Sequence, residues 1–279
     1  MASESTGRGD PERTLKLLWR VDLRSSRGPK PGLTLDAVVA AAIALADEGG
    51  LGAVSMRAVA DRLGVGTMSL YTYVPSKAEL LDLMKDTVIG EQAAAIRRAT
   101  TEDPDDPESP LTVGWRDGLV ALAQSSWDLY HAHRWILQMA HARATLGPNE
   151  VRMLDASLRV VDGLGLRGRD MVAIVDLVAV YVGGAARSAI EAADAPAATG
   201  QTDDDWWLER VRILEQKMGD GSAFPTVTRV SADGGFDVDE AQAEYNLAFA
   251  LDDYRFGLER VLEGIERFLE ARGGRPDAG

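Results

Sequence analysis

The chain of 279 residues contains no cysteine and only three histidines. Without cysteine it can form neither a disulfide framework nor a thiolate site for a metal or for nucleophilic catalysis. The histidines are His131, His133 and His141, and the first two lie two positions apart on a predicted helix, so they face different directions. No carboxylate accompanies them at zinc-ligand spacing. We therefore expect no metal and no cofactor.

The sequence also lacks the common motifs of enzyme active sites. It contains no GxGxxG loop, no GxSxG nucleophile turn and no HExxH pair. Without a candidate base, nucleophile or cofactor loop, we do not expect an enzyme. Turnover of a bound compound would distinguish an enzyme from a sensor, which releases its ligand unchanged.

Long apolar runs are missing as well. Residues 1–10 are polar, and the longest apolar stretch, residues 171–186, is interrupted by Asp176. That stretch is shorter than the ~20 residues that a membrane-spanning helix needs. We expect no membrane segment and a cytoplasmic protein.

Positive charge is scarce and unevenly placed. The chain carries a net charge of −14 and has a pI of about 4.7, whereas a general architectural DNA-binding protein is expected to be basic. The first 77 residues hold 10 basic and 8 acidic side chains, net +2, so the other 202 residues carry −16 of that total. Such an asymmetry orients a molecule in the field of DNA. For the C-terminal part we favour the simpler interpretation that acidity keeps the protein in solution.

The most informative segment is residues 55–77, SMRAVADRLGVGTMSLYTYVPSK. Its first half predicts an amphipathic helix whose apolar stripe is Met56, Val59, Ala60 and Leu63. Gly64 supplies a left-handed C-cap, and a short helix over Thr67–Tyr73 follows. A helix of this length is not stable alone, so tertiary packing must hold it.

The side chains of the second helix favour contact with DNA. Val65 and Leu70 can face the core, and most of the others carry hydroxyl or aromatic groups that reach phosphates and base edges. An ordinary helical hairpin with a solvated polar face is the alternative. The flanking sequence favours a small domain, because Thr34 can N-cap a helix over residues 35–47. Ser76 and Glu79 have the spacing of a capping box at the start of a further helix.

These residues resemble the TetR family of transcriptional repressors through the runs ALADEGG, VSMRAVADRLGV and MSLYTYVPSKAELLDLM. The resemblance implies that the third helix enters the major groove and the second supports it. It also implies a DNA-contacting set: Ser55, Arg57, Thr67, Met68, Ser69, Tyr71, Thr72, Tyr73 and Lys77. Arg57 is the best candidate for guanine, because a guanidinium matches O6 and N7, whereas Lys77 and Tyr71 suit phosphates. Leu70 and Val74 match core positions of the family.

The first 32 residues predict a basic, flexible arm. Arg20, Arg24 and Arg27 are candidates to lie along DNA, where arginines enter a narrow minor groove. A free tail is the alternative. The apolar knot of Leu15, Leu17, Leu18 and Trp19 indicates that part of the arm is a short docked helix.

The remaining sequence is helical in pattern, without a strand signal. We expect an all-α protein: an arm over 1–32, a three-helix helix-turn-helix DNA-binding domain over 33–78, a helical ligand-binding and dimerisation domain over 79–273, and a tail over 274–279. Within the long domain we predict helices over 115–139, from Pro148 past Val161, over 171–191 and from about 239 to 271. The segments 101–110, 192–205 and 224–235 are predicted to be loops or linkers.

Landmarks in this second region resemble the tetracycline-repressor branch of the family. They are Trp115 with His133-Arg134, and the runs 256–259 and 264–266 in the last helix. The resemblance implies an all-helical ligand-binding and dimerisation domain. The small residues 183–186 and the apolar positions of the last helix are compatible with a homodimer.

The tetracycline and magnesium contacts of that branch fall near Ala93, Leu122, Ser126 and Ala140, which are mostly apolar here. We therefore expect an apolar or aromatic effector and not magnesium-chelated tetracycline. The candidate lining is Trp115, Leu122, Ser126, Trp127, Tyr130, Gln138, Met139, Asp176 and Tyr181. Plain core packing is the alternative for each of them.

Together these features predict a repressor that leaves double-stranded palindromic operator DNA when a small hydrophobic molecule binds. An activator, or a constitutive DNA-binding protein without an effector, is the alternative.

Overall fold

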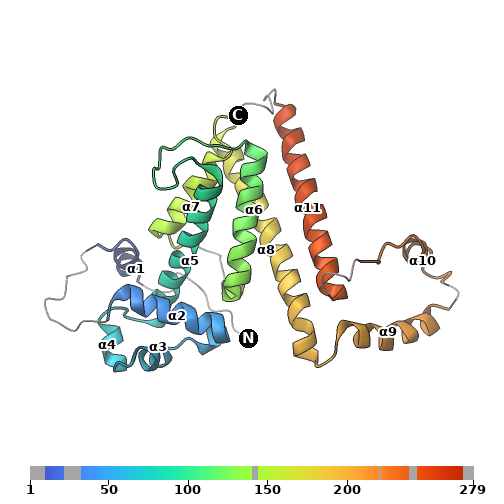
Figure 1. Cartoon of the computed structure of the whole chain (residues 1–279), viewed down its shortest axis with the longest axis horizontal. Coiled ribbons are helices and arrows are strands. Elements are labelled where there is room, and N and C mark those ends of the chain that lie inside the picture. Colours follow the sequence, from blue (N-terminus) through green and yellow to red (C-terminus); the bar gives the residue numbers. More distant parts are fainter. Residues whose placement is uncertain (1–9, 22–32, 140–143, 220, 239–243, 273–279) are drawn as a thin grey trace. The chain divides into compact units, whose positions relative to one another are not determined.

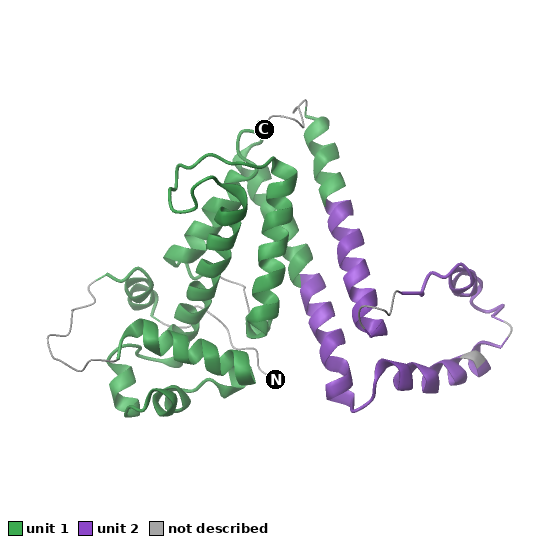
Figure 2. Cartoon of the chain, viewed as in Figure 1, with its two compact units in different colours: residues 1–183, 262–279 green, residues 184–261 purple. Residues whose placement is uncertain are grey.

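The structure is a computed structural model that describes residues 10–21, 33–139, 144–219, 221–238 and 244–272 (Figure 1). Those residues form helices and loops without a strand, apart from an isolated bridge between Thr101 and Leu111. The all-α prediction is thus confirmed for this part of the chain. The fold divides into two compact units, residues 1–183 with 262–279 (unit 1) and residues 184–261 (unit 2), coloured separately in Figure 2.

The first part of unit 1 contains α2 (Leu35–Gly49), the short 3-10 helix η1 (Leu51–Ala53), α3 (Met56–Leu63) and α4 (Thr67–Tyr71). Side-chain caps begin two of these helices: Thr34 Oγ1 accepts from Ala37 N at 3.0 Å, and Ser55 Oγ accepts from Ala58 N at 3.1 Å. Gly64 ends α3 in the left-handed conformation, with φ 66°. The helix-turn-helix predicted from sequence is therefore present, and we call residues 33–76 the head.

The long helix α5 (Lys77–Thr100) connects the head to the rest of unit 1. It packs against α2 of the head and against α6 (Trp115–Ala132) and α7 (Pro148–Arg159), which lie beside it in Figure 1. One continuous core joins these parts, because buried residues of the head and α5 pack with Leu129, Trp135 and Ile136. The head is therefore not an independently closed module.

The helix predicted over 115–139 is shorter than expected. The α-helix α6 ends at Ala132, His133 leaves helical geometry with φ −126° and ψ 64°, and the 3-10 helix η2 (Arg134–Gln138) follows. This break directs Trp135 and Ile136 into the shared core. Residues 101–110 form the predicted loop.

The N-terminal arm contains an ordered helix, α1 (Pro11–Leu18). The prediction that all of residues 1–32 are flexible is therefore wrong for Pro11–Leu18. Asp10 caps α1 by accepting from Arg13 N at 2.9 Å. Leu17 and Leu18 are buried in the core of unit 1, and α1 packs on α5. The apolar knot thus forms the short docked helix that these residues indicated.

The C-terminal part contains α8 (Gly168–Thr199), α9 (Asp203–Met218), α10 (Pro225–Ala232) and α11 (Tyr245–Glu270). Two predicted linkers are wrong. The alanine-rich run keeps α8 helical to Thr199, because alanine has the best helix propensity, and Thr202 then accepts from Asp205 N at 3.2 Å to cap α9. In the predicted loop 224–235, Pro225 occupies the first turn of α10, where proline is tolerated.

Helix α8 is longer than the apolar run seen in the sequence. By length and composition alone it could cross a membrane, with 39% of its most apolar window buried in the structure. A single helix of this kind is weak evidence for a membrane protein, since core helices of soluble domains meet the same criterion.

Candidate DNA-contacting face and ligand pockets

The outer face of α4 is exposed as the sequence predicts. Leu70 has no exposed surface, and Val74 is equally buried beneath it, so both core assignments are confirmed. Met68 is 78% exposed, and Ser69, Tyr71 and Thr72 are exposed with it. Leu70 and Val74 thus anchor this short helix in the core, and the opposite side of the helix presents polar and aromatic side chains to solvent.

The other predicted DNA contacts are placed less uniformly. Arg57 and Ser55 are exposed, Arg57 with only a long 3.8 Å ion pair to Asp61, whereas the Ser55 hydroxyl already caps α3. Three further candidates are half-buried, namely Thr67, Tyr73 and Lys77. No DNA is present, so the contacts themselves remain predictions.

A bidentate ion pair that the sequence did not reveal fixes α3 on α2. The Arg62 guanidinium donates two hydrogen bonds to Glu48, each 2.7 Å long. The hydrogen bond and charge of Arg62 hold the pKa of Glu48 below its ordinary value. The pair orients α3, which supports the exposed face of α4.

Arg20 does not lie free for DNA in this structure. Its guanidinium forms an ion pair with Asp36 at the start of α2, and the neighbouring Trp19 donates its indole N–H to the Leu146 carbonyl at 2.9 Å. Arg24 and Arg27 lie outside the described residues. The placement of Arg20 differs from the expectation because α1 docks onto the protein and carries Arg20 to Asp36.

A second set of contacts ties the end of α6 to the head. Asp47, in the last turn of α2, lies 2.8 Å from His133 Nδ1 and accepts from Trp135 Nε1 at 2.7 Å. These contacts join His133 and η2 to the head. The sequence indicated His133 only as a landmark, because its partner lies 86 residues away.

Of the other two histidines, the structure describes only His131. His131 Nδ1 lies 2.9 Å from the Trp127 carbonyl on its own helix, away from the Asp47 site, and His141 lies outside the described residues. Among the described residues no group of three His, Asp or Glu gathers in a geometry suited to a metal ion.

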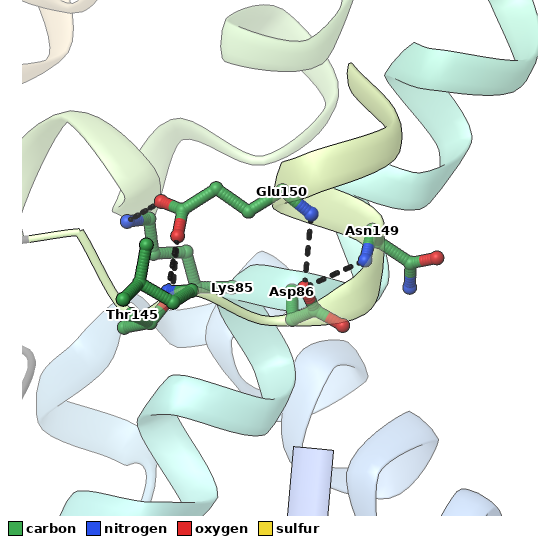
Figure 3. A network of polar contacts seen from close by, with 6 residues as sticks. Lys85, Asp86, Thr145, Asn149 and Glu150 are labelled. Carbon is green, nitrogen blue, oxygen red and sulfur yellow. Dashed lines mark hydrogen bonds and ion pairs between the residues drawn. The ribbon is translucent and has the colours of Figure 1, made fainter. Parts of the chain in front are cut away.

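Helices α5 and α7 are joined by a buried polar network, shown in Figure 3. Asp86 accepts hydrogen bonds from Asn149 N and Glu150 N, each 3.1 Å long. It thereby caps the N-terminus of α7, because the N-cap residue Gly147 has no side chain that could do so. Lys85 pairs with Glu150 at 2.8 Å. A Cβ at position 147 would collide with the Asp86 carboxylate, which explains the glycine.

The two carboxylates of this network differ in electrostatics. Burial raises the pKa of Asp86, although two backbone N–H donors oppose the effect. Burial also acts on Glu150, but the hydrogen bond and charge of Lys85 prevail and lower the pKa of that carboxyl. Glu150 is therefore the anionic partner that holds the network together.

The nine predicted ligand-lining residues differ in burial. Trp115, Leu122, Ser126 and Met139 are buried, whereas Gln138 and Asp176 are exposed. Trp127, Tyr130 and Tyr181 are half-buried. The Trp127 ring lies against His131, with the ring centroids 4.4 Å apart. Burial raises the pKa of Tyr130. Ser126 accepts from Gln92 Nε2 at 2.8 Å. For the buried members, core packing describes the observed environment.

The described residues include one pocket in unit 1 and another in unit 2. The first, of about 280 Å³, lies between α1, α5 and α7 and is lined by Trp19, Asp86 and Arg152 among others. The second, of about 440 Å³, lies in unit 2 between α8, α9 and α11. Neither is lined by any of the nine residues, and the sequence did not predict either pocket.

Comparisons with known proteins match both parts of the chain. Residues 38–84 match the family described as bacterial regulatory proteins, tetR family, and residues 106–269 match the tetracyclin repressor-like C-terminal domain. The HTH-type transcriptional repressor DrrR1 of Streptomyces coeruleorubidus is 40% identical over 273 residues, which cover 98% of this chain and 92% of the relative.

Solved structures agree in fold. The TetR family protein ActR of Streptomyces coelicolor, in complex with actinorhodin, has a TM-score of 0.61 at 23% identity. The match covers 89% of this chain and 100% of the ActR chain. A TetR variant from Acinetobacter baumannii in complex with minocycline has a TM-score of 0.51 at 22% identity, covering 85% and 98% of the two chains. With a helix-turn-helix head, a tetracyclin repressor-like helical domain and relatives that are regulators and not enzymes, this chain belongs to the TetR family of bacterial regulatory proteins.

Proposed function

We propose that the protein is a repressor that holds a short palindromic operator as a homodimer and releases it when a small molecule binds. The observation that carries the DNA-binding part is the exposed face of α4, anchored by the fully buried Leu70. The name of the relative DrrR1, a transcriptional repressor at 40% identity, supports repression over activation.

A second copy of the chain would cover apolar surface that one copy leaves open. Leu177 and Val180 on α8 are exposed, the latter by 75%, and Phe256 on α11 is exposed as well. Burying such side chains is worth about 25 cal/mol per Å² of apolar surface. In a two-fold dimer on DNA, the two α4 helices would be one helical turn apart, ~34–36 Å.

Relatives with known structures bind small molecules, ActR with actinorhodin and a TetR variant with minocycline, which supports an effector here. The contacts of Asp47 with η2 and the passage of α5 from the head to α7 give two routes by which a ligand could bias the head. A coupling of about 1–3 kcal/mol would change operator affinity about 5- to 150-fold.

The test begins with selection of an operator from random double-stranded DNA by the full-length protein. The double variant S69A/Y71A should then lose operator binding, because it removes from the exposed face of α4 a hydroxyl that can reach a base edge and a phenol suited to a phosphate, while circular dichroism shows it folded. The variant F224A/S231A removes an exposed aromatic ring and hydroxyl of α10 and should bind normally. Retained affinity in S69A/Y71A would contradict the assignment of α4, and binding that rises with added compound would favour an activator.

A further inference from the structure

The pocket of unit 1, between α1, α5 and α7, has the features of a site for a small ligand. Its volume of about 280 Å³ lies just below the ~300–1,000 Å³ of typical small-molecule sites, so it suits a compact molecule of one or two rings. Leu18 and Leu83, both buried, contribute apolar surface to it. Its lining residues all belong to unit 1, and none lies on α8 or α11, which carry the apolar residues that a second copy would cover.

The indole of Trp19 forms one wall of this pocket. Its Nε1 donates to the Leu146 carbonyl at 2.9 Å, which joins the end of α1 to the segment before α7. The residue is nevertheless 48% exposed, so part of the ring is open to a guest. Because the hydrogen bond already fixes the ring, a flat aromatic molecule can stack on it without the cost of ordering it first.

Arg152, on α7, is the lining residue best suited to hold a charged ligand group. Its Nη1 donates to the neutral amide oxygen of Asn149 at 2.8 Å, and the structure records no ion pair between Arg152 and another described residue. The Asn149 side chain in turn lies beside Gly90 of α5, where a Cβ would come within 2.8 Å of Asn149 Cγ. Asn149 therefore orients the guanidinium and leaves its other N–H donors for an acceptor. A guanidinium matches a carboxylate through two parallel hydrogen bonds.

Two other charged residues line the pocket, and both have partners within the protein. Arg20 pairs with Asp36 in the first turn of α2. Asp86 is 4% exposed, and its Oδ1 accepts from two backbone N–H groups at the start of α7 (Figure 3). Burial raises the pKa of Asp86, and its N–H donors and the charge of Arg152 oppose that shift. The lining thus carries two positive charges and one buried negative charge, so an anion would gain at Arg152 and a cation would be opposed by both guanidinium groups.

We propose that this pocket binds a compact aromatic carboxylate. Its ring lies against Trp19 and the buried leucines, and its carboxylate pairs with Arg152. The proposal adds a negative charge and a location in unit 1 to the aromatic effector expected from the sequence. It rests on the proposed function only where the molecule is assigned the role of effector, because binding can be measured without DNA. In that role the connection is Arg20, which lines the pocket and, through Asp36, contacts the head.

The test uses three naphthalene probes of similar shape and different charge: 2-naphthoate, 2-naphthamide and 2-(aminomethyl)naphthalene. Each is titrated by calorimetry into the full-length protein without DNA at pH 7. We expect the carboxylate to bind about five- to tenfold more tightly than the amide, in the range of a charge-assisted hydrogen bond at a partly exposed site. The amine should bind most weakly, because the two guanidinium groups of the lining oppose it.

Matched variants locate the effect. R152Q removes the charge but keeps a side chain that can donate a hydrogen bond, so it should lower the affinity of the carboxylate to that of the amide and leave the amide unchanged. R13Q removes the same charge from an exposed residue of α1 that does not line the pocket, and it should preserve the preference. W19L should weaken all three probes by a similar factor and also preserve the preference, with circular dichroism and Tm used to check the fold.

The outcomes separate the site from the function. Equal affinity for the three probes, tightest binding of the amine, or equal effects of R152Q and R13Q would overturn the site. If the carboxylate binds as described and the operator complex is unaffected, the site stands and its role as the effector site fails. If another compound releases the operator while the carboxylate does not bind, the proposed function stands and this site is wrong.

Discussion

The head and unit 2 are held together in different ways. In the head, Val59, Ala60 and Leu70 have no exposed surface, and side-chain caps and the Arg62–Glu48 pair fix the helix ends. In unit 2, α10 has no buried residue and α9 exposes Leu208 and Leu214. Most apolar residues of the head are therefore buried within unit 1, the exposed ones lying on α4, whereas unit 2 leaves apolar surface on α9 for a partner or ligand.

This difference matches the division of work in a ligand-controlled DNA-binding protein. A recognition helix needs a fixed orientation, so its buried residues must be fully packed. A region that responds to a small molecule or to a second copy needs surface that is not yet satisfied. The predictions below test whether the two regions really differ in this respect.

The largest effect is expected from truncating one leucine in each region. L70A removes a fully buried side chain from the head and should cost about 2–5 kcal/mol in the free energy of unfolding. L208A truncates a side chain that is 74% exposed on α9 and should change stability by no more than about 0.5 kcal/mol. Urea unfolding measures both. Similar losses in the two variants would show that α9 is packed in solution, as by a second copy of the chain.

The same contrast explains what could be predicted from the sequence. Thr34, Ser55 and Gly64 cap helices through neighbours three or four residues away, so these helix limits follow from local pattern. The end of α8 at Thr199 and the start of α10 at Pro225 were predicted wrongly. Residues that are common in turns are equally common at helix ends, so the local pattern did not separate a loop from a helix end there. The exposed face of α4 was predicted because Leu70 is the residue of Thr67–Tyr73 best suited to the core. The other side chains of this segment were therefore expected to face outward.

Contacts between distant residues could not be predicted. Asp47 with His133 and Trp135, and Asp86 with the start of α7, join residues 63 to 88 positions apart. The pocket of unit 2 depends likewise on Trp207 and Asn246, which are 39 positions apart. The sequence identified such residues as polar or aromatic, but only the fold brings them together.

The next prediction concerns the buried pair that fixes α5 to α7 in unit 1. K85M should destabilise the protein by about 2 kcal/mol near neutral pH, since it leaves the buried carboxylate of Glu150 without its counter-charge. Because Lys85 lowers the pKa of Glu150, the pair stabilises the fold above the ordinary pKa of a glutamate. That stability is lost as the pH falls through the lowered pKa. Unfolding free energies of wild type and K85M should therefore converge in acid; a constant gap would contradict this mechanism.

A smaller effect is expected from the helix that docks on unit 1 beside the head. W19F keeps an aromatic ring but replaces the indole and so removes the hydrogen bond to the Leu146 carbonyl, which should cost about 1 kcal/mol. R24A serves as a control from the same arm and should leave stability unchanged. W19F removes no positive charge, so it should also leave the salt dependence of operator binding unchanged. A phosphate contact of the arm would contribute about 0.9 to the slope of log K against log salt, so a flatter slope in R24A would restore the arm as a DNA contact.

The smallest effect concerns contacts within unit 1, between the start of α8 and the residues that follow α11. Asp170 pairs with Arg167 at 2.8 Å and with Arg272 at 2.6 Å, and these arginines lower its pKa from 3.8 to about 2. A carboxyl whose pKa is depressed by folding stabilises the protein above its ordinary pKa and loses that contribution as the pH falls towards 2. The Tm of wild type should therefore slightly exceed that of D170N above pH 4, and the difference should vanish in stronger acid. D162N, at an exposed acid of unit 1 for which the structure records no ion pair, is the control. If D170N and D162N have the same Tm at every pH, the ion pairs of Asp170 contribute nothing to stability. Buried contacts alone would then make unit 1 more stable than unit 2.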